Sequence, residues 1–177
     1  MSQDIALLRQ TLPAVLPRLR RFARTLARDA ADADDLAQAA IEKALARAAQ
    51  WRPPPAGAST DQVEAAVRSW MFGIIKNAWI DDRRAAQRHR RVFATATDAP
   101  EAPDNAHLAQ EHRLSIEAAM QRLPEEQRLA VALVLVEGLS YSEAAQVLDI
   151  PVGTLTSRLS RGREALMQLL DVPGEMP

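Results

Sequence analysis

Two short helical segments separated by a brief break, at residues 140–170, constrain this chain more than any other feature. The stretch reads SYSEAAQVLDIPVGTLTSRLSRGREALMQLL. Ser140 can cap the first helix, because Glu143 lies three residues later and completes a capping box. Pro151 then interrupts the helix, since proline lacks the backbone donor that a helix interior needs. Because the break is so short, the second helix must change direction, and the stretch predicts a helix-turn-helix.

The second helix of this motif has an apolar face and a polar face. Leucines recur at helical spacing and predict its buried side: Leu155, Leu159, Leu166 and Leu170. Hydroxyl side chains and arginines occupy the other side: Thr154, Thr156, Ser157, Arg158, Ser160 and Arg161. Arginine pairs with guanine edges or phosphates, and Ser or Thr bonds to a base or the backbone. The pattern predicts a helix that enters the major groove of DNA, although an ordinary solvated helical hairpin has similar features.

The composition predicts an all-α protein. Aromatic residues make up only 4% of the 177 residues, alanine is abundant and β-branched runs are scarce. This length suits one medium domain or two small ones, and we expect two small helical domains. The chain has no cysteine, which excludes disulfides and thiolate metal sites. Its three histidines lack the spacing of metal ligands, so we expect no metal and no cofactor.

The charge balance limits how the chain can bind nucleic acid. With 22 basic and 23 acidic residues, any contact with DNA must come from local patches. No apolar run approaches the roughly 18 to 20 residues of a membrane span, and no leader sequence is recognisable. We therefore expect a cytoplasmic protein without membrane contact. No nucleophile, metal cluster or phosphate loop indicates an enzyme or a small-molecule substrate.

Helical periodicity extends through the first part of the chain. It predicts a short helix around residues 4–10 and a second helix capped by Thr11, with Pro13 in its first turn. Asp32 is the expected cap of the next helix. The outer face of that helix is polar and, by pattern alone, typical of a solvated surface: Asp35, Gln38, Glu42 and Lys43.

A long third helix is predicted after the proline-rich loop at residues 52–59. Ser59 and Gln62 form a second capping box, and an apolar stripe continues to about Arg88. The end of this helix is strongly basic: Arg83, Arg84, Arg88, Arg90 and Arg91. The cluster is denser than a helix end requires, so it indicates contact with a phosphate backbone, although a solvated helix end also favours cations.

The composition changes at residues 92–106, which contain acids and prolines but no lysine or arginine. We interpret them as an acidic, flexible linker between a domain at residues 1–91 and a domain at residues 107–177. Further helices are predicted at about residues 105–122 and at residues 124–138, the second of which begins with Pro124. The second of these leads directly into the helix-turn-helix.

Together these segments resemble the extracytoplasmic-function (ECF) sigma factors of bacterial RNA polymerase, which keep only domains two and four of the sigma-70 family. DADDLAQAAIEKAL, at residues 32–45, resembles the segment that docks on the clamp coiled coil of the polymerase. RSWMFGIIKNAWIDDRR, at residues 68–84, is similar to the segment that recognises the −10 element. RLPEEQRLAVALVLVEGLSYSEAAQVLDIPVGTLTSRLSRGREAL, at residues 122–166, is similar to domain four, which reads the −35 element. Three matches in this order are far more specific than one helix-turn-helix.

The resemblance implies roles for particular residues. The polymerase-binding set is Asp35, Gln38, Glu42 and Lys43. Asn77 matches an asparagine that contacts an unpaired −10 base, and the residues implied to hold the −10 phosphates are Lys76, Arg83, Arg84 and Arg88. The −35 set is Thr154, Thr156, Ser157, Arg158, Ser160 and Arg161. The loop after Trp51 matches the segment that captures a flipped base, which single-stranded DNA requires beside a positive track.

The implied partners are core RNA polymerase, through its clamp coiled coil and flap, promoter DNA and an anti-sigma factor. The DNA would be duplex at −35 and single-stranded at −10. The segments RRFAR and PVGT look most like the general-stress-response branch of the family. The sequence departs from the family pattern at several points. Ala39 replaces an acid of the docking motif, the segment at residues 52–69 is longer than the usual connection, and Thr156 stands where many members carry lysine. Gly162 lies inside the recognition helix at a cost of about 1 kcal/mol relative to alanine.

Two other functions are compatible with parts of the sequence. A stand-alone helix-turn-helix repressor would bind duplex DNA tightly and would not associate with core polymerase. A sigma-like mimic would only sequester an anti-sigma factor. Such mimics carry a receiver domain, whereas no alternation of strand and helix patterns is visible here.

Overall fold

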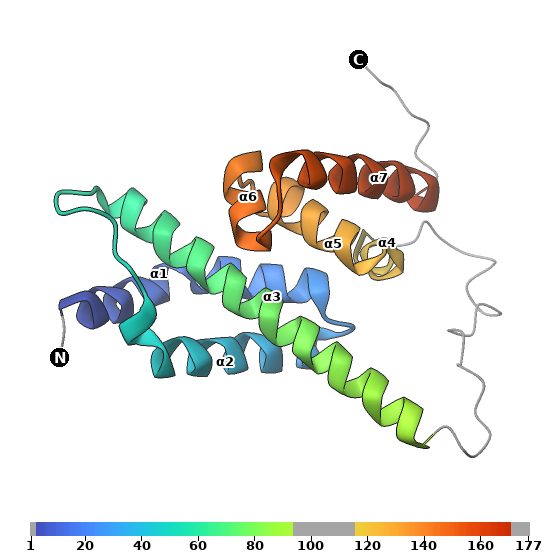
Figure 1. Cartoon of the computed structure of the whole chain (residues 1–177), viewed down its shortest axis with the longest axis horizontal. Coiled ribbons are helices and arrows are strands. Elements are labelled where there is room, and N and C mark those ends of the chain that lie inside the picture. The colour runs from blue at the N-terminus through green and yellow to red at the C-terminus, as the bar shows by residue number, and fades with distance from the viewer. Residues whose placement is uncertain (1–2, 94–115, 171–177) are drawn as a thin grey trace.

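The computed structural model describes residues 3–93 and 116–170, without the side chains of residues 89–93, and its described residues form helices and no strand (Figure 1). This confirms the all-α prediction. The elements are α1 (Gln3–Leu26), α2 (Ala30–Ala46), the 3-10 turn η1 (Ala48–Gln50), α3 (Thr60–Phe93), α4 (Ile116–Arg122), α5 (Glu125–Val131), the π-helical segment η2 (Ala132–Val136), α6 (Tyr141–Leu148) and α7 (Val152–Leu170). Within the described ranges, no helix is both long and apolar enough to cross a membrane.

Helix α1 is continuous, so the prediction of two helices divided at Thr11 is wrong. Thr11 is buried, and its hydroxyl donates a hydrogen bond to the Leu7 carbonyl (2.9 Å) instead of capping a new helix. Pro13 and Pro17 lie on the exposed side of the helix. A buried stripe continues past both prolines: Leu8, Val15, Leu19, Phe22 and Leu26. Its packing outweighs the cost of an interior proline, which is about 3 kcal/mol or more.

The cap of α2 also differs from the prediction. Asp29, not Asp32, is the N-cap residue, and its carboxylate accepts a hydrogen bond from the Asp32 amide (2.8 Å). Asp29 has an extended backbone, as capping residues do, whereas Asp32 already lies in the first helical turn. The helix therefore begins earlier than the sequence pattern suggested.

Both predicted capping boxes are confirmed. The Ser59 amide donates to Gln62 Oε1 (2.8 Å), and the Gln62 amide donates to Ser59 Oγ (3.3 Å). The same exchange links Ser140 and Glu143, with distances of 2.8 and 3.3 Å. Helix α3 then continues to Phe93, five residues past its predicted end. The rest of the predicted linker and the predicted helix start near residue 105 lie outside the described residues.

The first three helices form a bundle in which α1 packs against both α2 and α3. Phe22 of α1 meets Phe72 of α3 with ring centres 4.7 Å apart and planes tilted by 51°. Met71 and Ile75 are also fully buried, which confirms the predicted apolar stripe of α3. This bundle fixes which sides of α2 and α3 remain exposed.

Helices α5, α6 and α7 form the predicted helix-turn-helix unit. Gly138, with a φ of +69°, ends η2, and Asp149, with a φ of +56°, ends α6 before the break at Pro151. Helix α7 packs on α5, and Gly162 is buried at their contact. A Cβ atom at Gly162 would lie 2.7 Å from Val131 Cγ2, so the close approach of the helices explains the glycine.

The N-terminal half (α1 to α3) and the C-terminal half (α4 to α7) contact each other directly. Helix α1 touches α4, α5 and η2, while α3 touches α6. Figure 1 shows the C-terminal helices lying alongside α1 and α3. The buried apolar residues of the two halves form one continuous core. The sequence predicted two helical units but not that they would share a core.

Candidate nucleic-acid interface

The outer face of α2 carries most of the predicted polymerase-binding set. Asp35, Gln38 and Glu42 are exposed, and their spacing of three and four residues places them on one side of the helix. Gln38 Nε2 donates to Glu42 Oε1 (3.1 Å). Lys43 is half-buried and lies to one side of this row. The result is a polar stripe with two carboxylates.

Helix α3 divides the predicted −10 set between two of its sides. Asn77, Arg84 and Arg88 are exposed, and their spacing of seven and four residues aligns them in a single stripe along the helix. One amide and two guanidinium groups therefore face solvent together. Such a row suits a nucleic-acid strand, with the amide for a base and the cations for phosphates.

Lys76 and Arg83 lie on a second side of α3 and are half-buried against the C-terminal half. Arg83 Nε forms an ion pair with Glu125 Oε1 of α5 (2.7 Å), and its guanidinium lies 5.1 Å from the centre of the Trp79 ring. Burial lowers the pKa of Lys76, an effect opposed by the charge of Asp149 after α6. The five predicted −10 residues therefore do not form one open surface.

The predicted −35 residues occupy the outer side of α7 and one of its edges. Thr156, Ser157, Ser160 and Arg161 are exposed, whereas Thr154 and Arg158 are half-buried. Arg158 Nη2 forms an ion pair with Glu126 Oε2 (2.9 Å), which holds this arginine at the α5 edge of α7.

Two hydroxyl groups of the −35 set have partners within their own helix. Thr156 Oγ1 donates to the Val152 carbonyl (3.0 Å), and Ser160 Oγ donates to Glu164 Oε1 (3.2 Å). Both side chains nevertheless remain on the exposed side of α7. The described surface of this helix combines hydroxyls with arginines, as a major-groove contact requires.

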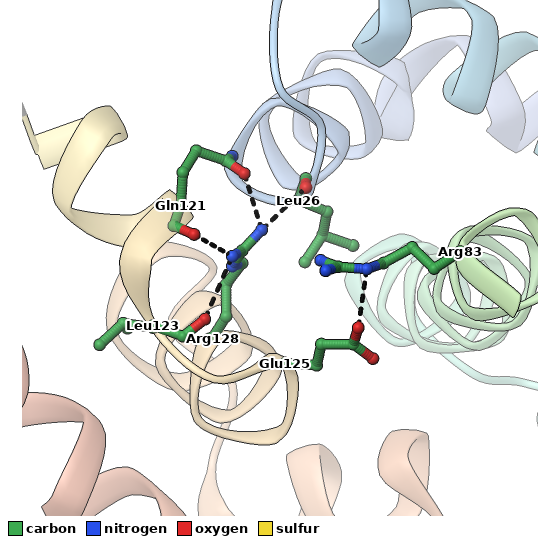
Figure 2. A network of polar contacts seen from close by, with 6 residues as sticks. All are labelled: Leu26, Arg83, Gln121, Leu123, Glu125 and Arg128. Atoms are coloured by element: carbon green, nitrogen blue, oxygen red, sulfur yellow. Dashed lines mark hydrogen bonds and ion pairs between the residues drawn. The ribbon is translucent and has the colours of Figure 1, made fainter. Parts of the chain in front are cut away.

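Sequence reasoning missed the polar contacts that join the two halves. Arg128 of α5, only 3% exposed, is at their centre (Figure 2). Its Nη1 donates to Gln121 Oε1 (2.7 Å) and to the Leu26 carbonyl at the end of α1 (3.3 Å). Its Nη2 donates to the carbonyls of Leu123 (3.1 Å) and Gln121. Burial, with a smaller effect of Arg83, lowers the pKa of Arg128 to about 10, so it is still charged at neutral pH.

A second contact between the halves is an ion pair with two hydrogen bonds. Arg21 of α1 donates from Nε to Glu137 Oε1 (2.8 Å) and from Nη2 to Glu137 Oε2 (3.0 Å). The Glu137 side chain is fully buried, and that of Arg21 is 49% exposed. The hydrogen bond to Glu137 is the main cause of the raised pKa of Arg21. These residues are 116 positions apart, so no local pattern could have indicated the pair.

We call the side chains that make these contacts the interdomain polar cluster: Arg21, Arg83, Gln121, Glu125, Arg128 and Glu137.

In the described ranges, no group of three or more acidic or histidine side chains could hold a metal ion.

Known sequences match both halves of the chain. The family model of sigma-70 region 4 matches residues 113–166, and the model of the sigma2 domain of PhyR matches residues 12–76. The ECF RNA polymerase sigma factor EcfG of Rhodopseudomonas palustris (strain TIE-1) is 35% identical over 172 residues, covering 94% of this chain and 87% of that protein. The chain belongs to the ECF sigma factors. The region 4 match includes α6 and most of α7, which confirms the helix-turn-helix of this sigma factor.

Other relatives agree with this family. SigM of Mycobacterium tuberculosis (strain H37Rv) is 36% identical over 153 residues, covering 86% of this sigma factor and 71% of SigM. The structure of RpoE of Bartonella quintana, solved with the anti-sigma factor NepR, has a TM-score of 0.72 at 29% identity and covers 94% and 98% of the two chains. CnrH, solved with the cytosolic domain of CnrY, shares the fold, with a TM-score of 0.62 at 22% identity.

Proposed function

We propose that this sigma factor binds core RNA polymerase and directs it to promoters through the −10 and −35 elements. The observation that supports this most is that three polar faces, on α2, α3 and α7, are exposed where the family resemblance assigns polymerase, −10 and −35 contacts. A stand-alone repressor would need only the last of these faces. The protein acts by positioning DNA and polymerase and catalyses no reaction itself.

The α2 stripe is the proposed contact with the clamp coiled coil. Asp35 and Glu42 present carboxylates, and Gln38 lies between them in a hydrogen bond to Glu42. The amide can turn to a partner side chain without leaving a buried group unpaired, because all three residues are exposed. Lys43, at the side of the row, completes the polymerase-binding set. A separate contact, between the C-terminal half and the polymerase flap, is also part of the proposal.

The α3 stripe is the proposed site for the melted −10 strand. Asn77 has both donors and an acceptor for the edge of an unpaired base, while Arg84 and Arg88 neutralise phosphates along the same side. Lys76 and Arg83 extend the positive track once they are accessible. The loop after Trp51 is the proposed place for a flipped base.

Helix α7 is the proposed reader of the −35 duplex. Ser157, Ser160 and Arg161 face outward, and Arg158 is held by Glu126 at the edge of the same surface. Because Glu126 is exposed, its carboxylate can be exchanged for a phosphate or a guanine edge at little cost. Thr154 and Thr156 complete the set near the start of the helix.

The net charge of −1 implies weak DNA binding by the isolated protein, since few counterions are released at each small basic surface. Polymerase must supply the remaining affinity. We also propose an anti-sigma factor as a partner, because RpoE of Bartonella quintana was solved with one and resembles this sigma factor over nearly its full length.

Binding assays with and without polymerase separate this function from its alternatives. We expect the protein to form a complex with core RNA polymerase and to bind duplex promoter DNA only weakly on its own at moderate salt. Tight, specific duplex binding together with no polymerase complex would identify a stand-alone repressor. Binding to an anti-sigma factor but not to core polymerase would instead identify a sigma-like mimic.

A further inference from the structure

One member of the proposed −35 surface has its partner on another helix. Thr156 and Ser160 bond to groups of α7 itself, whereas Arg158 Nη2 forms an ion pair with Glu126 Oε2 of α5 (2.9 Å). The two side chains of the pair differ in exposure, since that of Arg158 is 25% exposed and that of Glu126 is 67% exposed. The guanidinium therefore lies at the α5 edge of the surface, and the carboxylate lies beside it in contact with solvent.

We propose that Glu126 is a specificity-determining residue, which keeps Arg158 from DNA phosphates and leaves it available for a base edge of the −35 element. This inference rests on the −35 role proposed above for α7. Glu126 acts through Arg158 and makes no base contact of its own, so it is a positioning residue.

A phosphate gains little by replacing Glu126. Phosphate and carboxylate are both anions that accept hydrogen bonds from a guanidinium, so Arg158 would exchange one ion pair for another of the same kind. The displaced carboxylate would then lie close to the DNA backbone, where the phosphates repel its charge. Both effects weaken contacts that depend only on the backbone.

A guanine edge is favoured over a phosphate at the same position. Guanine presents two acceptors in the major groove, O6 and N7, and an arginine can bind both at once. The base edge carries no net charge, so it does not repel the nearby carboxylate of Glu126. The ion pair thus weakens phosphate contacts more than base contacts, and specificity arises from a difference of this kind.

The next arginine of the −35 set has different surroundings. Arg161 follows Arg158 by three residues and is exposed on the outer side of α7. An exposed cation on this surface can bind phosphates in any DNA sequence. We therefore expect Arg161 to contribute affinity and Arg158 to contribute sequence preference.

A purely structural role for Glu126 predicts a different result. Glu126 lies in the first turn of α5, where an acid stabilises the positive end of the helix. If this were its only role, its loss would lower the free energy of unfolding but would leave the choice of DNA sequence unchanged. Sequence preference must therefore be measured together with affinity.

Three substitutions separate these roles. Glu126→Gln removes the charge but keeps the size of a side chain that is largely exposed. The matched control, Glu117→Gln, makes the same change in net charge at an exposed carboxylate of the same half, which lines a groove beside α1. Arg158→Ala, alone and combined with Glu126→Gln, tests whether Glu126 acts through this arginine. Circular dichroism verifies that each variant keeps its helix content.

Two measurements compare these variants with wild type. Fluorescence anisotropy gives the affinity of the full chain for a labelled pool of duplex DNA of random sequence at several salt concentrations. Transcription by core RNA polymerase with each protein, from promoters with a randomised −35 segment, gives the base preference at each position of that segment.

We expect Glu126→Gln to bind the random duplex more tightly, by up to about fivefold, which is the full strength of an ion pair of this exposure. The plot of log affinity against log salt concentration should become steeper by about one, the value for one added phosphate contact. The preference for guanine should fall at one −35 position and stay the same at the others. In the Arg158→Ala background, Glu126→Gln should have no further effect, and Glu117→Gln should match wild type in both measurements.

Where wild type has a −35 preference, the same preference in Glu126→Gln would overturn the proposal. An equal gain in affinity from Glu117→Gln, or from Glu126→Gln in the Arg158→Ala background, would also overturn it. The proposed function has a separate readout. If wild type has no preference at any −35 position, the −35 assignment fails, while the salt dependence of Glu126→Gln still decides whether Glu126 keeps Arg158 from phosphates.

Discussion

At the scale of the residue, the proposed recognition depends on polar side chains held by different kinds of contact. Arg158 is 25% exposed and is fixed by Glu126, whereas Asn77 is exposed on a helix whose buried side is anchored in the core. Arg158, which is held in place, suits contact with an intact duplex. Asn77, which is exposed, suits contact with an unstacked base. Each assignment predicts a different defect when the side chain is removed.

Replacing Arg158 by alanine should weaken −35-dependent initiation by about 1 to 3 kcal/mol, because a base contact or a well-placed phosphate contact is lost. The ratio of initiation from promoters with and without a −35 element measures this effect. Arg163→Ala, an exposed arginine of the same helix outside the predicted set, serves as the control. Unchanged use of the −35-dependent promoter would remove Arg158 from the interface.

Asn77→Ala should change the preferred −10 sequence without weakening the complex with core polymerase. The amide can discriminate between base edges, whereas alanine cannot. Initiation from a set of −10 variants, with polymerase binding measured in parallel, separates the two effects. If wild type and variant use every −10 sequence in the same proportions, Asn77 reads no base.

At the scale of the element, the sequence predicted how some helices begin but not how the helices pack. Caps depend on near neighbours in the chain, whereas packing depends on distant segments. Capping boxes at Ser59 and Ser140 were predictable because their partners lie three residues away. The continuity of α1 past Pro13 was not, since it depends on packing against α2 and α3. Nor were the contacts of Arg128, whose partner at the end of α1 is 102 positions distant.

Gly162→Ala tests whether packing or helix propensity decides the effect of this residue on the free energy of unfolding. Propensity alone predicts stabilisation of about 1 kcal/mol. The structure predicts destabilisation of about 1 to 3 kcal/mol, because the added Cβ would lie 2.7 Å from Val131 Cγ2 and 3.3 Å from the Gln127 carbonyl oxygen. Gly153→Ala is the control, since nothing lies within 4 Å of a Cβ at that exposed position. Urea unfolding gives both free energies, and greater stability of Gly162→Ala would contradict the packing.

The capping box of α6 should make stability depend on pH. Hydrogen bonds from Ser140 lower the pKa of Glu143 below its usual value of 4.5. The carboxylate therefore stabilises the fold fully above that value, and the contribution is lost as the pH falls through the lower, folded pKa. Urea unfolding between pH 7 and acid should show a shallower loss for Glu143→Gln than for wild type. If the free energy of unfolding falls equally with pH in the two proteins, protonation of Glu143 does not weaken this capping box.

At the scale of the whole molecule, two helical units that the sequence separates share one continuous core. The predicted site residues are thereby divided into an open group on α2, α3 and α7 and a covered pair, Lys76 and Arg83. The sequence suggested these residues through the resemblance of three segments to the ECF sigma factors. It could not indicate the division, because that depends on contacts between distant segments, such as the one between Arg83 and Glu125.

Run-off transcription with core RNA polymerase and a library of −35 and −10 sequences tests the central proposal most directly. We expect specific transcripts only when this sigma factor is added, from promoters enriched in one −35 and one −10 sequence. Combining Arg158→Ala with Asn77→Ala should remove both preferences. Transcripts no more abundant or selective than those of core polymerase alone would contradict the proposed function.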